Sequence, residues 1–236
     1  MTIFSRLAQQ FNARFKLLQV TNCYQCHQPC AINQLICTQC IEDFKTFPCI
    51  DLLNLPQVAR HIKHQFVDGF YCFSHYEKPL SKWLGQLKYQ QQLYLTRALG
   101  QFADQLLINV VAQFDETEDI MLTTVPIHPL KWSKRGFNQC HEILKRTGVV
   151  QAFDYQPALF FQARQETQQR QLSGAVRRRR SRSFVITDAA RIKGRTIFIF
   201  DDVLTTGSTV NTLARLLKKA GANNVIVCTL ALSLQR

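Results

Sequence analysis

The pattern of apolar and polar positions divides the chain into two parts. Residues 1 to about 55 begin with a predicted amphipathic helix, apolar on one side from Ile3 to Leu18, and continue with a cysteine-rich segment. From about residue 66, short apolar segments typical of strands alternate with helical segments. The predicted strands are 66–76, 120–125, 196–200 and 224–230, and the predicted helices are 79–88, 93–112, 138–146 and 208–220. Apolar strands that alternate with helices are typical of a parallel sheet covered on both faces. We therefore expect an α/β fold, with a small N-terminal module (1–55) and a larger domain (56–236).

Composition changes this picture mainly through charge. The chain is 46% hydrophobic and 11% aromatic, which argues against a disordered protein. It has 29 Lys and Arg against 16 Asp and Glu, for a formal net charge of +13. The interval 131–195 holds 15 basic and 4 acidic residues, so +11 of this charge lies there. A basic tail and a uniformly basic surface are therefore excluded. The expected partner of the interval is a polyanion: a phosphorylated small molecule, a nucleic acid, or both.

The N-terminal residues contain no signal-peptide pattern, and no apolar run is long enough to span a membrane. The nine cysteines, an odd number with two Cys-x2-Cys pairs, fit a reducing cytoplasm better than a disulfide framework. We expect a cytoplasmic protein whose first helix packs on its own domain. Peripheral attachment to the inner membrane, or binding of a protein partner, is the alternative use of that helix.

The cysteine-rich segment has the spacing of a metal site. The four predicted ligands are Cys23, Cys26, Cys37 and Cys40. Four thiolates in two such pairs can surround one ion tetrahedrally, and zinc is the usual occupant. A site filled by four protein ligands is expected to be structural, and the alternatives are a redox pair or free thiols. Cys30 and Cys49 lie nearby and could replace a ligand. The other cysteines are expected to be core thiols, namely Cys72, Cys140 and Cys228.

A second pattern points to a phosphate site. The predicted strand 196–200 leads into Asp201 and Asp202, and a polar loop and a predicted helix follow. The loop residues are Thr205, Thr206, Gly207, Ser208 and Thr209. Ligands of open α/β sheets bind at the carboxyl ends of the strands. The loop N–H groups and hydroxyls at a helix N-terminus can cradle a phosphate, and the two acids can hold sugar hydroxyls or a hard cation such as Mg²⁺.

This segment resembles the phosphoribosyl-pyrophosphate (PRPP) motif of type I phosphoribosyltransferases. Together with the four-cysteine segment, three further segments in the same order resemble the ComF/GntX family, over nearly the whole chain from Cys23 to Leu232. They are Leu87-Lys88-Tyr89, Val125-Pro126 and Arg135-Gly136-Phe137-Asn138-Gln139. Within the family, the chain looks more similar to the competence proteins of naturally transformable bacteria than to the GntX branch.

The resemblance implies a type I phosphoribosyltransferase-like domain behind a zinc module, and it implies roles for particular residues. Asp201 and Asp202 would contact the ribose hydroxyls or Mg²⁺, and residues 205–209 would hold the 5-phosphate. Lys88 would face the pyrophosphate, and residues 135–139 would line the site. The expected catalytic residues are Asp201, Asp202 and Lys88. Two family features are missing: Thr205 stands where an acid often precedes Thr-Gly, and no Arg-x-x-Asn follows the basic loop.

The basic loop that would cover the site lies between residues 164 and 182. Its arginines are Arg164, Arg170, Arg177, Arg178, Arg179, Arg180 and Arg182. They could close over small phosphates, contact single-stranded DNA, or form a solvated run of charge. Phe160, Phe161 and Phe184 flank this loop and are expected to be core residues, with base stacking as the alternative.

The resulting prediction is a competence protein that natural transformation requires. It would handle incoming single-stranded DNA through a domain that binds PRPP or a nucleotide with Mg²⁺. The alternatives are an active phosphoribosyltransferase of unknown acceptor, a PRPP sensor, and a GntX-like non-catalytic adaptor that docks a DNA-uptake helicase or a recombination mediator. Because the sequence shows no evident general base for an acceptor, it leaves catalysis open.

Overall fold

A computed structural model describes residues 20–31, 35–162 and 184–234. The strands are β1 (Val20–Asn22), β2 (Pro29–Ala31), β3 (Gly69–His75), β4 (Ile120–Thr124), β5 (Asp154–Tyr155), β6 (Phe160–Gln162), β7 (Phe184–Ile186), β8 (Thr196–Leu204) and β9 (Asn224–Leu232). The α-helices are α2 (Thr38–Glu42), α3 (Pro56–Ala59), α4 (Leu80–Gln90), α5 (Thr96–Val111), α6 (Pro129–Arg135), α7 (Gln139–Leu144) and α9 (Ser208–Lys219). Short 3-10 turns are η1 (Leu52–Asn54), η2 (Leu93–Leu95) and η3 (Val149–Ala152).

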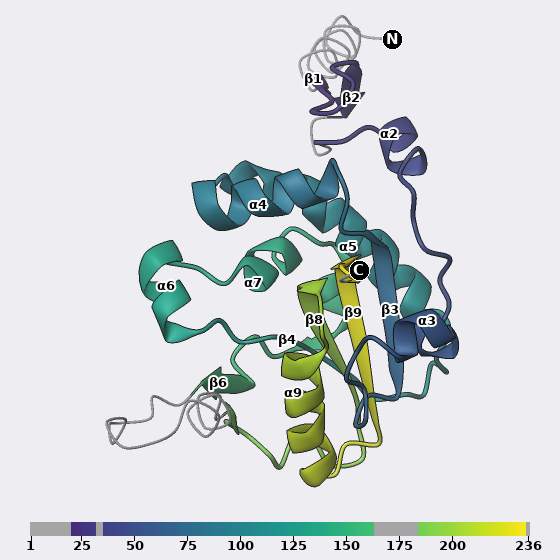
Figure 1. Ribbon diagram of the computed structural model, residues 1–236, viewed down its shortest axis with the longest axis vertical. Coiled ribbons are helices and arrows are strands. Elements are labelled where there is room, and N and C mark those ends of the chain that lie inside the picture. The colour runs from purple at the N-terminus through teal and green to yellow at the C-terminus, as the bar shows by residue number, and fades with distance from the viewer. Residues whose placement is uncertain (1–19, 32–34, 163–183, 235–236) are drawn as a thin grey trace, which may run out of the picture.

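The central sheet has the strand order β3-β9-β8-β4-β5, and all its pairings are parallel. Helix α9 covers one face and α5 the other (Figure 1). The alternation within β8 explains this arrangement. Phe198 and Phe200 are fully buried with α5, while Ile197 and Ile199 are fully buried with α9. The predicted parallel α/β fold is confirmed.

Several element boundaries differ from the prediction. Strand β8 continues four residues past its predicted end, so Asp201 and Asp202 lie inside the strand. The predicted helix 93–112 begins as the 3-10 turn η2 and becomes α-helical at Thr96. Helix α6 was not predicted. Its short sequence begins at Pro129, exposes its apolar side chains and buries none of them, so it lacks the usual apolar periodicity.

The cysteine-rich segment packs against α4 and α5. Phe44 lies with its ring centroid 4.7 Å from that of Phe102 and 5.7 Å from that of Trp83. The amide oxygen of Gln101 on α5 accepts hydrogen bonds from the backbone N–H groups of Leu35 and Ile36. Residues of this segment therefore share an apolar core with the helices. The division at residue 55 remains a prediction.

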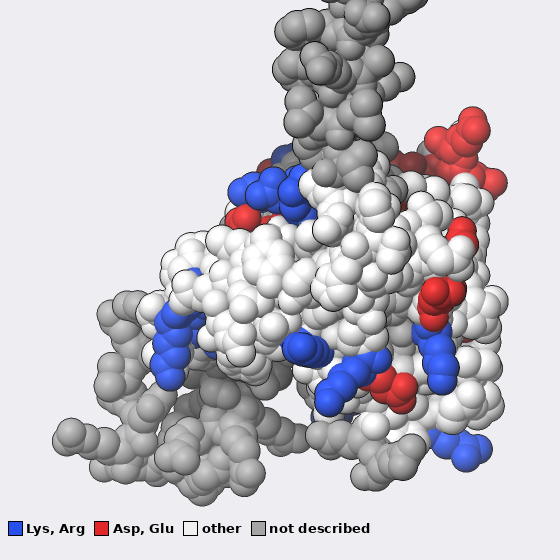
Figure 2. Space-filling view, turned by 90° about the horizontal axis from the view of Figure 1, so that it is seen from above, with Lys and Arg blue, Asp and Glu red and all other residues white. Residues whose placement is uncertain are grey.

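Two other predicted features lie outside the described residues: the opening amphipathic helix and the basic loop from Arg164 to Arg182. Among the helices that the structure does describe, none combines the length and apolar character needed to cross a bilayer. Figure 2 shows the surface seen from above, where uncharged residues cover most of the area and the Lys and Arg side chains stand apart from one another.

Candidate functional site

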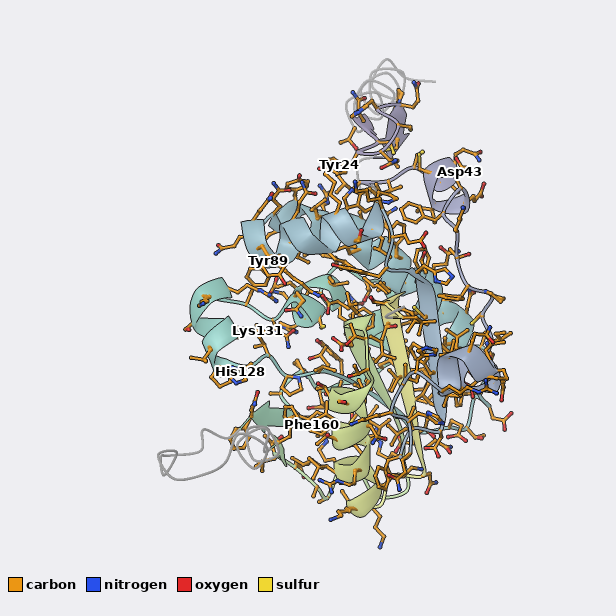
Figure 3. All side chains as sticks on the ribbon, in the orientation of Figure 1. Tyr24, Asp43, Tyr89, His128, Lys131 and Phe160 are labelled. Carbon is orange, nitrogen blue, oxygen red and sulfur yellow. The ribbon has the colours of Figure 1, made fainter. Side chains whose placement is uncertain are left out.

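A pocket of about 330 Å³ opens at the carboxyl edge of the sheet, between α4, α6 and the start of α9. In Figure 3, Tyr89, Lys131 and His128 follow one another along this opening, from the end of α4 down along α6. Several predicted site residues from distant parts of the sequence meet here. The predicted residues on the pocket wall are Lys88, Arg135, Gln139, Asp201, Asp202, Thr205 and Thr209.

The two acids lie side by side within β8, held by their own backbone. The N–H of Asp202 donates to Asp201 Oδ1 at 2.9 Å, and the N–H of Val203 donates to Asp202 Oδ1 at 3.0 Å. Lys88, in the last turn of α4, forms an ion pair with Asp202 Oδ2. Both partners are largely withdrawn from water, with side chains 16% and 4% exposed. Gln139 Nε2 donates to the other oxygen of Asp202 at 3.5 Å.

This environment shifts the pKa values of the two acids in opposite directions. Burial raises the pKa of Asp201 to about 7, and the neighbouring charge of Asp202 adds to the effect. Burial also disfavours ionised Asp202, but the charge of Lys88 and the hydrogen bonds from Lys88 and Gln139 outweigh it and hold the pKa of Asp202 below its usual range. At neutral pH Asp202 is therefore the charged member, while Asp201 exchanges its proton near that pH.

Cys140 is buried in the core, as expected, and it also belongs to this group. Its thiol donates to Asp201 Oδ1 at 3.6 Å. Burial raises the pKa of Cys140 well above its usual range, and the two acids add to this, so the thiol is neutral. Donor atoms of Cys140, Asp201 and Asp202 lie within 4.8 Å of one another. Because Mg²⁺ prefers oxygen ligands, the two carboxylates are the residues that would hold it.

The family segment 135–139 connects α6 to α7, and its residues have different structural roles. Gly136 ends α6 in a left-handed conformation, and Phe137 packs on the apolar core. Asn138 caps α7, and its side-chain amide donates to Val125 O at 3.0 Å, which fixes the turn to the end of β4. Arg135 hydrogen-bonds Gln139, and both face the pocket. The segment therefore places one cation and one amide beside the acid pair.

The predicted phosphate loop starts α9 at the pocket. Thr205 and Thr209 line the pocket, and the hydroxyls of Thr206 and Ser208 lie 3.2 Å apart. Gly207 has a φ of 67°, in the left-handed region. A Cβ there would lie 2.6 Å from the carbonyl oxygen of Lys63, whose N–H donates to Thr206 O at 2.8 Å. Glycine is therefore required by both conformation and space.

Replacing Gly207 with alanine is expected to lower the free energy of unfolding by about 2 kcal/mol or more. Left-handed backbone costs a residue with a Cβ about 1 kcal/mol, and the overlap with Lys63 adds to this. Gly194→Ala is the matched control, since Gly194 has a φ of 78° and an open surrounding. Urea denaturation measures both variants, and equal losses would contradict the steric part of the argument.

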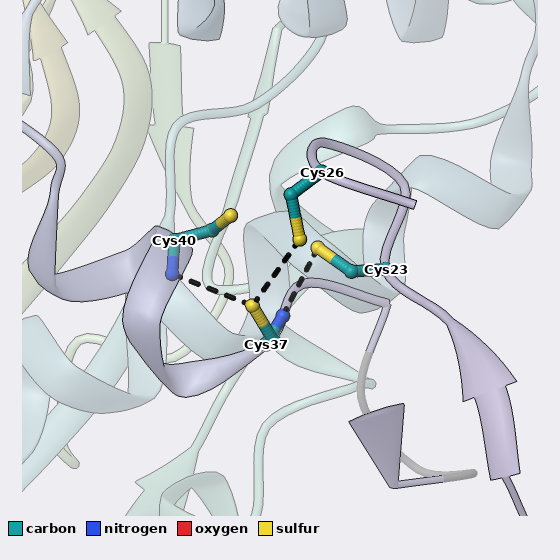
Figure 4. A group of neighbouring side chains, drawn as sticks. All are labelled: Cys23, Cys26, Cys37 and Cys40. Atoms are coloured by element: carbon teal, nitrogen blue, oxygen red, sulfur yellow. Dashed lines mark hydrogen bonds between the residues drawn. The ribbon is translucent and has the colours of Figure 1, made fainter. Parts of the chain in front are cut away.

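The four predicted zinc ligands also meet. Figure 4 shows Cys23 and Cys26 on one turn facing Cys37 and Cys40 at the start of α2. Their sulfur atoms all lie within 4.8 Å of one another, and the Sγ atoms of Cys26 and Cys37 are 3.7 Å apart. Tetrahedral zinc with bonds of ~2.3 Å separates its sulfurs by about 3.8 Å, so the arrangement fits zinc.

Backbone N–H groups around Cys23 favour its thiolate form. Burial disfavours the charged form of Cys23, but backbone N–H groups of Cys26, Cys37 and Gln25 outweigh it and lower the pKa of Cys23 to about 6. Cys30 and Cys49 do not belong to the cluster of four. Cys72 and Cys228 are buried core thiols, as predicted.

The sequence did not single out Tyr89, His128 and Lys131 as separate members of the site, although the first of them lies in the Leu87-Lys88-Tyr89 segment. Gln162 and Phe184 also line the pocket from β6 and β7. Of the three phenylalanines that flank the basic loop, Phe160 and Phe184 are buried and Phe161 is 49% exposed. Positions that approach the pocket from separate elements carry no local motif, so only the assembled fold reveals them.

Known proteins resemble the chain over most of its length. It is 25% identical over 209 residues to competence protein F of Haemophilus influenzae, covering 83% of this chain and 90% of that protein. It is 27% identical over 229 residues to DNA utilization protein YhgH of Escherichia coli O157:H7, covering 90% and 97%. The family model of the phosphoribosyl transferase domain matches residues 136–236. A solved hypoxanthine-guanine-xanthine phosphoribosyltransferase aligns with 57% of this chain and 64% of its own, at 16% identity and a TM-score of 0.34.

Proposed function

The chain is a homologue of competence protein F and of the DNA utilization protein YhgH, with a phosphoribosyl transferase domain in its C-terminal part, and from this we propose that it acts in the use of incoming DNA through a site for PRPP or a nucleotide with Mg²⁺. The observation that carries the proposal is the pocket itself. It brings Asp201, Asp202 and Lys88 together with the hydroxyl-bearing loop that starts α9.

Each part of the ligand would meet suitable chemistry. The 5-phosphate would lie against the loop at the N-terminus of the 12-residue helix α9, where the backbone N–H groups of the first turn and the helix dipole favour an anion. Asp201 and Asp202 would accept hydrogen bonds from the ribose hydroxyls or hold Mg²⁺. The metal ion would neutralise phosphate charge, and Lys88, Lys131 and Arg135 would supply further cations.

A second candidate function is phosphoribosyl transfer to an acceptor. The cations on the pocket wall favour it, because departing pyrophosphate carries negative charge that Lys88 and Arg135 could stabilise. Pyrophosphate release from PRPP, measured with and without single-stranded DNA, tests this candidate. A PRPP sensor or a non-catalytic adaptor would bind PRPP without releasing pyrophosphate. In the adaptor, the cysteine module would dock a DNA-uptake helicase or a recombination mediator.

Calorimetric titration of the full chain with PRPP is the test of the proposed site. Binding is expected to require Mg²⁺, and the double variant Asp201→Asn, Asp202→Asn is expected to weaken it about tenfold or more, since a charged hydrogen bond contributes ~1.5–3 kcal/mol. Asp68→Asn is the control, because that acid pairs with Lys218 near the C-terminal end of α9, remote from the pocket. Unchanged PRPP binding in the double variant would place the site elsewhere.

A further inference from the structure

Helix α6 exposes side chains that the proposed phosphoribosyl site does not use, namely Leu130, Trp132 and Lys134. None of its seven residues is buried. Trp132 is 51% exposed and Leu130 is 69% exposed. Tyr89, at the end of α4, is 81% exposed and lines the same pocket as Lys131 of α6. Large aromatic side chains that stay in water around a pocket mouth mark a surface for contact with a ligand.

Helical spacing places the useful side chains on one side of α6. His128, Lys131 and Arg135 stand at intervals of three and four residues, and all three line the pocket. Trp132 stands four residues after His128 and three before Arg135, so it borders the same face. The rim of the pocket therefore combines aromatic rings with cations, and Figure 3 shows Tyr89, Lys131 and His128 one after another along it.

Acidic residues are missing from this part of the sequence. No Asp or Glu occurs in residues 78–103, which include α4, or in residues 120–141, which include α6. Lys134 adds a further exposed cation to α6. By contrast, Arg191 and Arg195 of the same basic interval are paired with acids, through Asp154 and Asp119. The cations of α6 are therefore available to a polyanion that approaches the pocket.

The open geometry favours a strand of nucleic acid over a single base. A site for one small ligand encloses most of its surface, whereas Tyr89 and Trp132 leave most or half of their surface in water. Single-stranded nucleic acid binds through a series of contacts, in which bases stack on aromatic rings and phosphates lie beside cations. Duplex bases are already stacked on one another and are less accessible to such rings.

We propose that α6 and the end of α4 form a binding surface for single-stranded DNA at the mouth of the pocket. Bases would stack on Trp132 and Tyr89, and Lys131, Lys134 and Arg135 would contact the phosphates. The proposal rests on the proposed function and names the surface by which a strand reaches the site. It is independent of the arginines between residues 164 and 182.

Tryptophan fluorescence tests the stacking directly. The chain has two tryptophans: Trp83 is 2% exposed and buried in the core, and Trp132 is on the proposed surface. Titrating the full chain with oligothymidine is expected to quench Trp132, and Trp132→Phe is expected to bind the oligonucleotide without quenching. Thymidine monophosphate at equal nucleotide concentration is expected to quench little, and duplex DNA less than the single strand. Equal quenching by the monophosphate would overturn the strand assignment in favour of a single-nucleotide site.

Variants then measure the contribution to binding. Trp132→Ala is expected to weaken oligothymidine binding about tenfold, the effect of losing one stacked base. Lys131→Ala with Lys134→Ala is expected to make binding less dependent on salt. Lys219→Ala is the matched control, since Lys219 is an exposed lysine in the last turn of α9, at the opposite end of that helix from the pocket.

The outcomes separate this proposal from the proposed function. If Trp132→Ala and the double lysine variant both bind oligothymidine as the native chain does, the proposed DNA surface is wrong. This result would not contradict the PRPP site. Loss of PRPP binding in the acid double variant, together with normal quenching of Trp132, would support both the site and the surface. If PRPP does not bind the native chain but oligothymidine quenches its Trp132, the DNA surface is supported and the phosphoribosyl site is wrong.

Discussion

Replacing Lys88 with methionine is expected to lower the free energy of unfolding by about 3–5 kcal/mol, the usual effect of leaving one member of a buried ion pair without its partner. Lys88 and Asp202 have side chains only 16% and 4% exposed, so water would not replace the lost ammonium group. The methionine fills a similar volume, which limits the contribution of packing to the loss. Urea denaturation at neutral pH measures the difference.

The pH dependence of this loss identifies its cause. In the native protein Lys88 outweighs burial and holds the pKa of Asp202 below its unfolded value, so this pair stabilises the fold at neutral pH and the stabilisation disappears as pH falls through the pKa of Asp202. In Lys88→Met the hydrogen bond from Gln139 remains but the opposing charge is lost, so burial is expected to raise the pKa of Asp202 above its unfolded value. The variant then takes up a proton on folding, and the difference from the native protein is expected to narrow from pH 7 towards pH 4.

Two further variants separate charge from packing. Lys88→Met combined with Asp202→Asn is expected to recover much of the lost stability, because no charge then stays buried without a partner. Lys82→Met is the matched control, since Lys82 is exposed on the same helix. A loss of less than about 1 kcal/mol in Lys88→Met would mean that the pair behaves as a solvated surface pair.

The parts of the site that residue spacing alone predicted lie close together along the chain, whereas Lys88 and residues 135–139 were expected only from the family resemblance. Asp201, Asp202 and the loop up to Thr209 form one continuous segment, and the four cysteines fall within 18 residues. Local spacing alone decides which of these side chains can meet. Strands β8 and β9 could also be predicted locally. Both faces of each strand are buried, which leaves uninterrupted apolar segments in the sequence.

The parts that the sequence missed depend on how distant elements pack. Cys140 follows Asn138 on a short helix, and only the packing of α7 against β8 brings its thiol to Asp201. The extension of β8 beyond Phe200 depends on its pairing with β9, where Leu204 lies opposite Leu232. Asp201 and Asp202 end the apolar pattern in the sequence, which predicts the end of the strand. Hydrogen bonds to β9 nevertheless continue β8 past these two acids.

Chelating the zinc that the cysteine cluster is expected to hold, or replacing Cys37 with serine, is expected to unfold the cysteine-rich segment. Structural zinc with four protein ligands contributes ~10–16 kcal/mol in small modules, comparable to the whole stability of an ordinary domain. The effect would extend beyond the cluster, because Tyr24 and Phe44 pack against Trp83, with ring centroids 5.9 and 5.7 Å away. Losing these contacts would admit water to Trp83.

Metal content and tryptophan emission together measure this outcome. One zinc ion per chain is expected in the freshly purified protein and a substoichiometric amount in Cys37→Ser, whose Trp83 emission is expected to shift to longer wavelength. Cys49→Ser is the matched control, because Cys49 is half-buried outside the cluster and accepts a hydrogen bond from Gln113. Since Trp132 is already exposed, a Trp132→Phe background assigns the shift to Trp83 alone. Freshly purified protein without metal, or a Cys37→Ser variant with unchanged emission and melting temperature, would contradict a structural zinc site.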